Sequence, residues 1–132
     1  ATRCINVMRD SAELAKYEAD KGHFDLVFEC TAVESAIRSA IASLRPRGTL
    51  IQVGVAGDTP IPMNAIVAKE IKLQGTFRFH EEFAQAVDAI TSGRINVLPI
   101  ITQRFPLDQA TEAFATAADR SRAVKVHLNF FT

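Results

Sequence analysis

The sequence predicts an α/β fold with a parallel sheet, and a strand, a helix and a second strand in succession carry this prediction. Residues 24–31 form a nearly unbroken apolar run that ends in small polar residues, as buried parallel strands do at a ligand crevice. A helical pattern follows at residues 33–44, and a second apolar strand follows at residues 48–55. This order and length match a right-handed βαβ crossover, so we expect a nucleotide-binding sheet.

The helix at residues 33–44 is expected from an apolar stripe whose small alanines allow close packing against a sheet. The stripe consists of Ala36, Ile37, Ala40, Ile41 and Leu44. Upstream of the first apolar run, residues 3–7 are expected to form a short strand. Residues 11–20 are expected to form a helix that ends at Gly22.

Beyond the second strand, Pro60 and Pro62 restrict residues 57–62 to a loop or an edge strand, because proline cannot donate to a central ladder. Helical and alternating apolar patterns predict the rest, and Gly93 caps one of the helices. In order, these elements are a short helix at 64–69, a strand at 71–77, a helix at 81–92, a β segment at 99–105, a helix at 108–120 and a strand at 123–130.

Composition excludes several classes of function. With 48% apolar residues, 23% charged residues and a formal charge of zero, the chain lacks the basic excess that nucleic-acid binding requires. No apolar run approaches the ~20 residues of a membrane span, and the first residues do not resemble a signal peptide. We therefore expect a cytoplasmic protein without a nucleic-acid or membrane partner. Cys4 and Cys30 lie far apart in apolar strands, which favours buried, reduced thiols over a disulfide.

Four blocks of the sequence, in order and at matching spacing, resemble a known family. They read FDLVFECT at 24–31, RGTLIQVGV at 47–55, KEIKLQGTFRF at 69–79 and ITQRFPL at 101–107. Together they are similar to the C-terminal part of a zinc-type medium-chain dehydrogenase/reductase of the sorbitol and L-idonate 5-dehydrogenase group. The resemblance implies a partial Rossmann-like, doubly wound parallel sheet from the third strand onward at residues 1–95, with strand three at 1–7. Residues 96–132 would belong to the C-terminal segment of the catalytic domain.

The reaction implied by the resemblance is hydride transfer between a secondary alcohol of a polyol or sugar acid and NAD or NADP, with zinc polarising the alcohol oxygen. The chain contains no G-x-G-x-x-G turn, and its three histidines show no metal-ligand spacing with either cysteine. We therefore expect a fragment that is inactive by itself and assign it no catalytic or metal-binding residue. The zinc ligands and the pyrophosphate turn would lie in the full-length parent.

The resemblance places cofactor contacts at the ends of two strands. These are Cys30 and Thr31 on the adenosine side, and Val53, Gly54 and Val55 on the nicotinamide side. Gly54 lets the backbone approach a ligand, although it also fits a simple turn at the strand end. Ala32 stands where the family often has glycine, which leaves ordinary packing at the strand end as an alternative for this segment.

A third group of contacts follows the strand at 71–77. The resemblance assigns Phe77, Arg78 and Phe79 to the cofactor, and Arg78 and Phe79 also to the substrate. A guanidinium between two aromatic residues can be held over a cofactor or polyol, and a surface-paired arginine is the alternative. Phe79 occupies a position where tyrosine is frequent in the family, so a hydroxyl contact with substrate is lost. His80 is expected to start a helix rather than to relay a proton.

The family's dimers continue the sheet into a second subunit through the strand at 71–77, so the resemblance implies a homo-oligomer paired at this edge. Two alternatives remain open. One is a non-enzymatic Rossmann-like oligomerisation or binding module. The other is a different Rossmann-like protein, such as half of a methyltransferase, which the blocks at 75–78 and 101–107 argue against.

Overall fold

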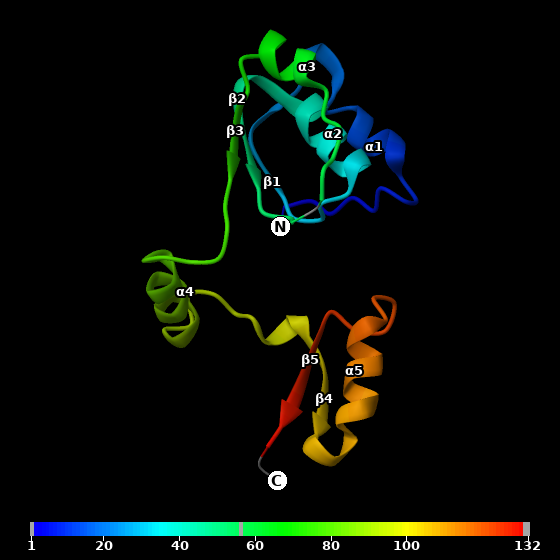
Figure 1. The fold of residues 1–132 in the computed structure, drawn as a ribbon, viewed down its shortest axis with the longest axis vertical. Coiled ribbons are helices and arrows are strands. Elements are labelled where there is room, and N and C mark those ends of the chain that lie inside the picture. The colour runs from blue at the N-terminus through cyan, green and yellow to red at the C-terminus, as the bar shows by residue number, and fades with distance from the viewer. Residues whose placement is uncertain (1, 56, 131–132) are drawn as a thin grey trace. The chain divides into compact units, whose positions relative to one another are not determined.

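The structure, a computed structural model, describes residues 2–55 and 57–130, and the chain divides into two compact units, Ala1–Arg78 and Phe79–Thr132. In the first unit, three parallel strands form one sheet in the order β1-β2-β3 (Figure 1). Their bounds are Phe24–Glu29 for β1, Leu44–Gln52 for β2 and Lys72–Gly75 for β3. The expected parallel α/β sheet is confirmed.

Two helices make the crossovers of this sheet. α2 (Glu34–Ser43) connects β1 to β2 and contacts both strands, and α3 (Met63–Ala68) lies between β2 and β3 in the chain and contacts α2. The apolar stripe of α2 supplies much of one core cluster, and full burial of one such side chain contributes about 1.5–3 kcal/mol. The buried members of the cluster are Ile37, Ala40, Ile41, Leu44, Leu50, Ile66 and Ile71.

The strand expected at residues 3–7 is wrong. Residue 1 lies outside the described residues, and residues 2–6 have no regular secondary structure before a turn begins. Asn6 starts this turn, because its backbone oxygen accepts from Arg9 and Asp10 and its side-chain oxygen accepts from the Met8 N–H. The helix expected at 11–20 is divided into α1 (Ser11–Ala15) and the short 3₁₀ helix η1 (Ala19–Lys21).

The carboxyl end of α2 differs from the expected boundary by one residue. Leu44 is extended and fully buried, and it begins β2 directly after Ser43 instead of closing the helix. The Lys69 ammonium occupies this end, where it donates to the backbone oxygens of Ile41, Ala42 and Leu44 at 3.1, 2.7 and 2.9 Å. A cation at this end also favours the helix dipole.

The face of β1 that carries Leu26 and Phe28 is exposed. Leu26 and Phe28 have 47% and 61% of their surface accessible, and among the described residues β1 pairs with β2 alone. Cys4 and Cys30 are free thiols, as expected, but both are exposed, so their predicted burial is wrong. The apolar stretch around Cys30 predicts burial, whereas β1, which ends one residue before it, has one neighbouring strand among the described residues.

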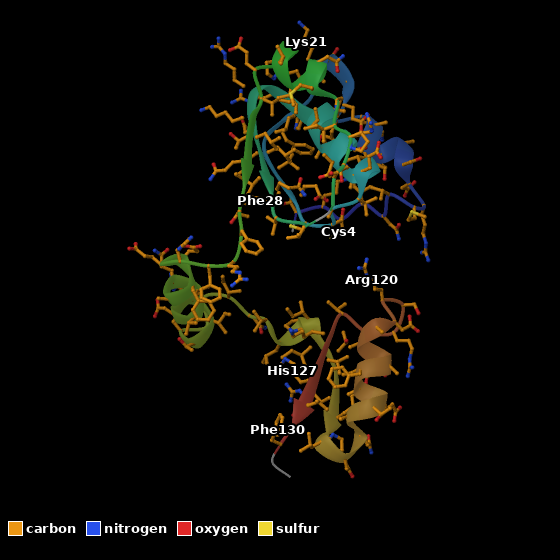
Figure 2. All side chains as sticks on the ribbon, in the orientation of Figure 1. Cys4, Lys21, Phe28, Arg120, His127 and Phe130 are labelled. Atoms are coloured by element: carbon orange, nitrogen blue, oxygen red, sulfur yellow. The ribbon has the colours of Figure 1, made fainter. Side chains whose placement is uncertain are left out.

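The second unit contains α4, two parallel strands and a helix that connects them. The bounds are Glu82–Thr91 for α4, Leu98–Ile100 for η2, Ile101–Pro106 for β4, Leu107–Gln109 for η3, Ala110–Ala118 for α5 and Lys125–Asn129 for β5. α5 contacts both strands, and its buried residues are Ala113 and Thr116. His127 on β5 and Phe130 just beyond it are labelled in Figure 2. The domain boundary expected at 95/96 stays a prediction, because compact units alone do not identify domains.

Candidate cofactor site

The carboxyl ends of β1, β2 and β3 meet at one edge of the first sheet. The strands are parallel, and their register places Glu29 beside Gln52 and Gln52 beside Gly75. The segments that continue from these positions contain Cys30 and Thr31 after β1, Val53 to Val55 after β2, and Phe77 after β3. Ligands of open α/β sheets bind at such an edge, so the structure brings together the strand ends of the expected cofactor contacts in this unit.

A buried carboxylate connects the first two strand ends. Glu29 is only 4% exposed, and its Oε1 accepts from the Thr31 N–H at 2.8 Å and from the Thr31 hydroxyl at 2.5 Å. Its Oε2 accepts from the Ala32 N–H at 2.9 Å and from Gln52 Nε2 at 2.5 Å. Four donors therefore satisfy a charge that would be costly to bury without partners.

Two opposing effects act on the Glu29 carboxyl. Burial by itself raises its pKa, but hydrogen bonds from Thr31, Ala32 and Gln52 outweigh burial and hold the pKa below its ordinary value. The carboxyl is therefore ionised at neutral pH and acts as an acceptor only. It cannot serve as a proton donor there.

Gly54 and Ala32 touch each other across the two strand ends. A Cβ placed on Gly54 would lie 2.5 Å from the Ala32 nitrogen and 3.0 Å from Glu29 Oε2, so a larger residue does not fit. Ala32 has a φ of 61°, in the left-handed region where glycine is at ease and alanine is strained. The backbone at this position therefore favours glycine.

The backbone amides of Val53 and Gly54 are engaged within the protein. Both N–H groups donate to the backbone oxygen of Glu29, at 2.8 and 2.9 Å, and the Gly54 oxygen accepts from Gln52 Nε2 at 3.0 Å. These two amides therefore have partners within the protein. Val53 and Val55 remain exposed as side chains, at 41% and 76%, and a contact with cofactor through these two residues stays a prediction.

Arg78 is the last residue of the first unit, and its guanidinium carbon lies 5.0 Å from the centroid of the Phe77 ring. This cation–π contact holds the guanidinium against the Phe77 ring. Arg78 has a φ of 63°. Phe79 belongs to the second unit, where its ring packs on Phe83 with centroids 4.8 Å apart. The His80 N–H donates to the Glu82 carboxylate at the start of α4, which supports the helix-start interpretation.

Two cavities open along the first sheet. One, of about 630 Å³, is lined by Cys30 and Thr31 together with residues of α1 and α2. The other, of about 520 Å³, is lined by Gly54 and Val55 together with Asp58 and Thr76. Both volumes lie in the range of small-molecule sites.

Sequence reasoning did not identify Glu29 and Gln52 as part of this edge. The available signal was a carboxylate at the end of an otherwise apolar strand, followed two residues later by a threonine. A buried charge needs partners, so this pattern favours a local hydrogen-bond network. Gln52 could be found only by aligning the two strands, which requires their register.

No group of three histidine, cysteine, aspartate or glutamate side chains that could hold a metal ion occurs within residues 2–55 and 57–130. The described residues thus do not fit a zinc ion. None of the helices in this part of the chain is both long and apolar enough to cross a membrane.

Comparison with known families classifies the chain. The profile of the family described as "Zinc-binding dehydrogenase" matches residues 1–92. The chain belongs to the zinc-binding dehydrogenase family. The family resemblance of the four sequence blocks is confirmed, and half of a methyltransferase is excluded.

Two curated zinc-binding dehydrogenase relatives are similar over most of the chain. L-idonate 5-dehydrogenase (NAD(P)(+)) of Escherichia coli is 37% identical over 127 residues, which are 96% of this chain and 36% of that protein. Sorbitol dehydrogenase of Gallus gallus is 35% identical over 105 residues, which are 79% of this chain and 29% of that protein. The chain therefore spans about a third of the length of these relatives.

A solved structure supports the same fold. The crystal structure of L-idonate 5-dehydrogenase from Escherichia coli superposes with a TM-score of 0.84 at 38% sequence identity. The match covers 88% of this chain and 34% of that chain. The expected partial Rossmann-like fold is confirmed by this similarity together with the family match.

Proposed function

We propose that this chain contributes to an oxidoreductase that transfers a hydride between NAD(P) and a secondary alcohol of a polyol or an L-idonate-like sugar acid. The observation that carries the proposal is the 37% identity to L-idonate 5-dehydrogenase over 96% of the chain. A relative named for sorbitol, a polyol, extends the substrate class beyond sugar acids. The chain spans about a third of these proteins, so the activity is proposed for the complete polypeptide.

The part played by this chain is dinucleotide binding at the carboxyl edge of the first sheet. In the proposed site, Cys30 and Thr31 border the adenosine half, and Val53, Gly54 and Val55 border the nicotinamide half. The parallel register of β1 and β2 supports this arrangement, because it brings both loops to one edge. A bound NAD or NADP supplies the hydride acceptor. The protein groups bind and orient it.

Arg78 is proposed to recognise the substrate and the cofactor, with Phe77 and Phe79 beside it in sequence. A guanidinium binds a carboxylate through paired, charge-assisted hydrogen bonds, which suits a sugar acid. Among the described residues of the first unit, no carboxylate forms an ion pair with Arg78, and its guanidinium lies over the Phe77 ring. This favours the functional role over the surface-paired alternative.

The experiment is an assay of the protein expressed from its complete reading frame, with NAD or NADP and with L-idonate or sorbitol. We expect dinucleotide reduction with at least one of these substrates. Arg78→Ala should raise KM for the acid more than for the neutral polyol. Arg45→Ala is the matched control, because Arg45 pairs with Asp25 on the surface at the start of β2.

The two negative outcomes have different meanings. No turnover and no dinucleotide binding by the complete protein would overturn the proposal and favour the binding or oligomerisation module. Equal effects of Arg78→Ala and Arg45→Ala would overturn the role of Arg78 alone. The 132 residues by themselves are expected to be inactive, and turnover by this chain that Arg78→Ala abolishes would contradict that expectation.

The proposed assembly is a homo-oligomer that pairs through the β3 edge. All four residues of β3 are exposed, and β3 pairs with β2 alone among the described residues. An open edge of this kind favours strand addition between copies. The proposed location is the cytoplasm, where exposed free thiols such as Cys4 and Cys30 stay reduced, and cell fractionation tests it.

A further inference from the structure

Glu29 joins the two loops that border the proposed dinucleotide site. Its carboxylate accepts two N–H groups from the loop after β1 and also accepts from Gln52 at the end of β2. Its backbone oxygen accepts from Val53 and Gly54 in the loop after β2. One buried residue thus holds both loops by hydrogen bonds from its side chain and its backbone.

The two loops also meet directly. The Gly54 backbone lies so close to Ala32 that an added Cβ would be 2.5 Å from the Ala32 nitrogen. Neither loop can move toward the other, and the Glu29 hydrogen bonds oppose movement apart. The relative position of the two loops is therefore determined by this contact and by the Glu29 network together.

We propose that Glu29 is a positioning residue that clamps the loops after β1 and β2 and thereby sets the affinity of the edge for a dinucleotide. The inference rests on the proposed function, because the loops contact a cofactor only if that function holds. Glu29 is 4% exposed and its four side-chain hydrogen bonds are all to protein groups. It therefore acts through the loops and not by touching the cofactor.

The test of the clamp is amide hydrogen exchange in the 132-residue chain carrying Glu29→Gln. The substitution keeps the volume, but its NH₂ group cannot accept the hydrogen bonds that one carboxylate oxygen receives. We expect exchange to become faster at Thr31 and Ala32, and also at Gly54. The Gly54 N–H keeps its own acceptor, the backbone oxygen of residue 29, so its faster exchange would report loop separation.

Glu34→Gln is the matched control for this experiment. Glu34→Gln makes the same chemical change on an exposed face of α2, where the Glu34 carboxylate pairs with Arg38. We expect no change of exchange in either loop. If Glu29→Gln does not fold, Thr31→Val removes the hydroxyl that donates to Glu29 and accepts from the Val33 N–H, and it should shift the same amides by a smaller factor.

The test of positioning is the dissociation constant and KM for NAD and NADP in the protein expressed from its complete reading frame. Loss of the hydrogen bonds that one carboxylate oxygen receives should raise both by about tenfold, with a smaller change in kcat. A role limited to stability would lower the unfolding midpoint and leave the dissociation constant and KM unchanged at low temperature.

The remaining outcomes distinguish a failure of the Glu29 positioning role from a failure of the proposed function. Unchanged exchange at Gly54 in Glu29→Gln would overturn the clamp. Faster exchange with unchanged dinucleotide affinity would overturn the positioning role while leaving the proposed function intact. If the unmodified protein binds neither dinucleotide, the proposed function fails, and the positioning role fails with it.

Discussion

Ala32 is a residue whose backbone conformation conflicts with its side chain. Its φ of 61° lies in the left-handed region, which costs an L-residue with a Cβ roughly 1–2 kcal/mol. Glycine avoids this cost but loses more conformational entropy on folding, by roughly 0.5–1 kcal/mol relative to alanine. The strain is maintained by the hydrogen bond from the Ala32 N–H to Glu29.

We predict that Ala32→Gly raises the free energy of unfolding by about 0.5–1 kcal/mol, because relief of strain exceeds the entropic cost. Urea denaturation followed by circular dichroism measures it. Ala36→Gly, within α2, is the control and should lower the same quantity by up to about 1 kcal/mol, because its backbone is helical. If both variants are destabilised equally, Ala32 is not strained.

Glu29 should make the stability of the first unit depend on pH. Its folded-state pKa is lower than the ordinary value of 4.5, so the unfolded chain binds its proton more tightly. The contribution to stability is therefore fully present above this ordinary value and is lost as the pH falls through the lower folded-state pKa. The hydrogen bonds that lower the pKa are the same ones that hold the two loops.

We predict that the difference in unfolding free energy between the unmodified chain and Glu29→Gln is largest near neutral pH and shrinks on acidification. Denaturant titrations from about pH 7 to about pH 3 measure it. Glu34→Gln is the control for the loss of a carboxylate that pairs on the surface. A constant difference across this range would contradict the assignment of the pKa to the Glu29 network.

At the residue scale, the sequence is most informative at positions that match a family pattern. It is least informative about contacts that depend on the register between strands. The resemblance implies glycine at the position of Ala32, and the φ of 61° there favours glycine. The partnership of Glu29 with Gln52 could not be predicted, because those residues are 23 positions apart and meet only through the alignment of β1 with β2. The exposure of Cys30 could not be predicted either, because it depends on which strands lie beside β1.

Among the elements, α2 depends on a side chain from a distant segment. Lys69, just beyond α3, donates three hydrogen bonds to backbone oxygens at the carboxyl end of α2 and the start of β2. These oxygens include acceptors that a helix leaves without internal partners. Burial lowers the pKa of the Lys69 ammonium, and the Glu18 carboxylate opposes this shift.

We predict that Lys69→Met lowers the free energy of unfolding by about 1–3 kcal/mol, because several backbone oxygens lose a charged donor. Thermal and urea denaturation measure it. Lys72→Met is the matched control, since Lys72 is exposed on β3, and it should change stability by less than about 0.5 kcal/mol. Similar losses for the two variants would show that the ammonium contributes little to the end of α2.

Most elements could be predicted from apolar periodicity, and the exceptions have physical causes. β1, α2, β2 and α5 each carry a clear apolar pattern, and the structure contains an element at each expected place. The segment at 3–7 has a similar short pattern, but an isolated strand without a neighbour gains no ladder hydrogen bonds, and Asn6 forms a turn instead. The pattern shows which residues are apolar but not which strands are present to pair.

At the scale of the whole molecule, the β3 edge has its hydrogen-bonding groups arranged for strand addition. The Thr76 N–H donates to the Gln52 oxygen on β2 at 3.1 Å. Because N–H groups alternate in direction along a strand, those of Lys72 and Gln74 also point toward β2, and those of Leu73 and Gly75 point outward. The outward groups are the ones that a second copy would use in a two-fold symmetric pair.

We therefore predict that the unmodified chain is a dimer or a larger species in size-exclusion chromatography with light scattering, and that Leu73→Pro shifts it toward monomer. Proline removes an outward-pointing donor and leaves the β2 ladder intact. Leu73→Ala is the control for the lost side chain and should keep the assembly.

Gln74→Pro removes an inward-pointing donor, so it should destabilise the sheet itself and lower the unfolding midpoint. Leu73→Pro should lower this midpoint much less. A clean monomer of the unmodified chain at high concentration would refute assembly through β3, and a dimer that persists in Leu73→Pro would direct attention to the other free edge, at β1.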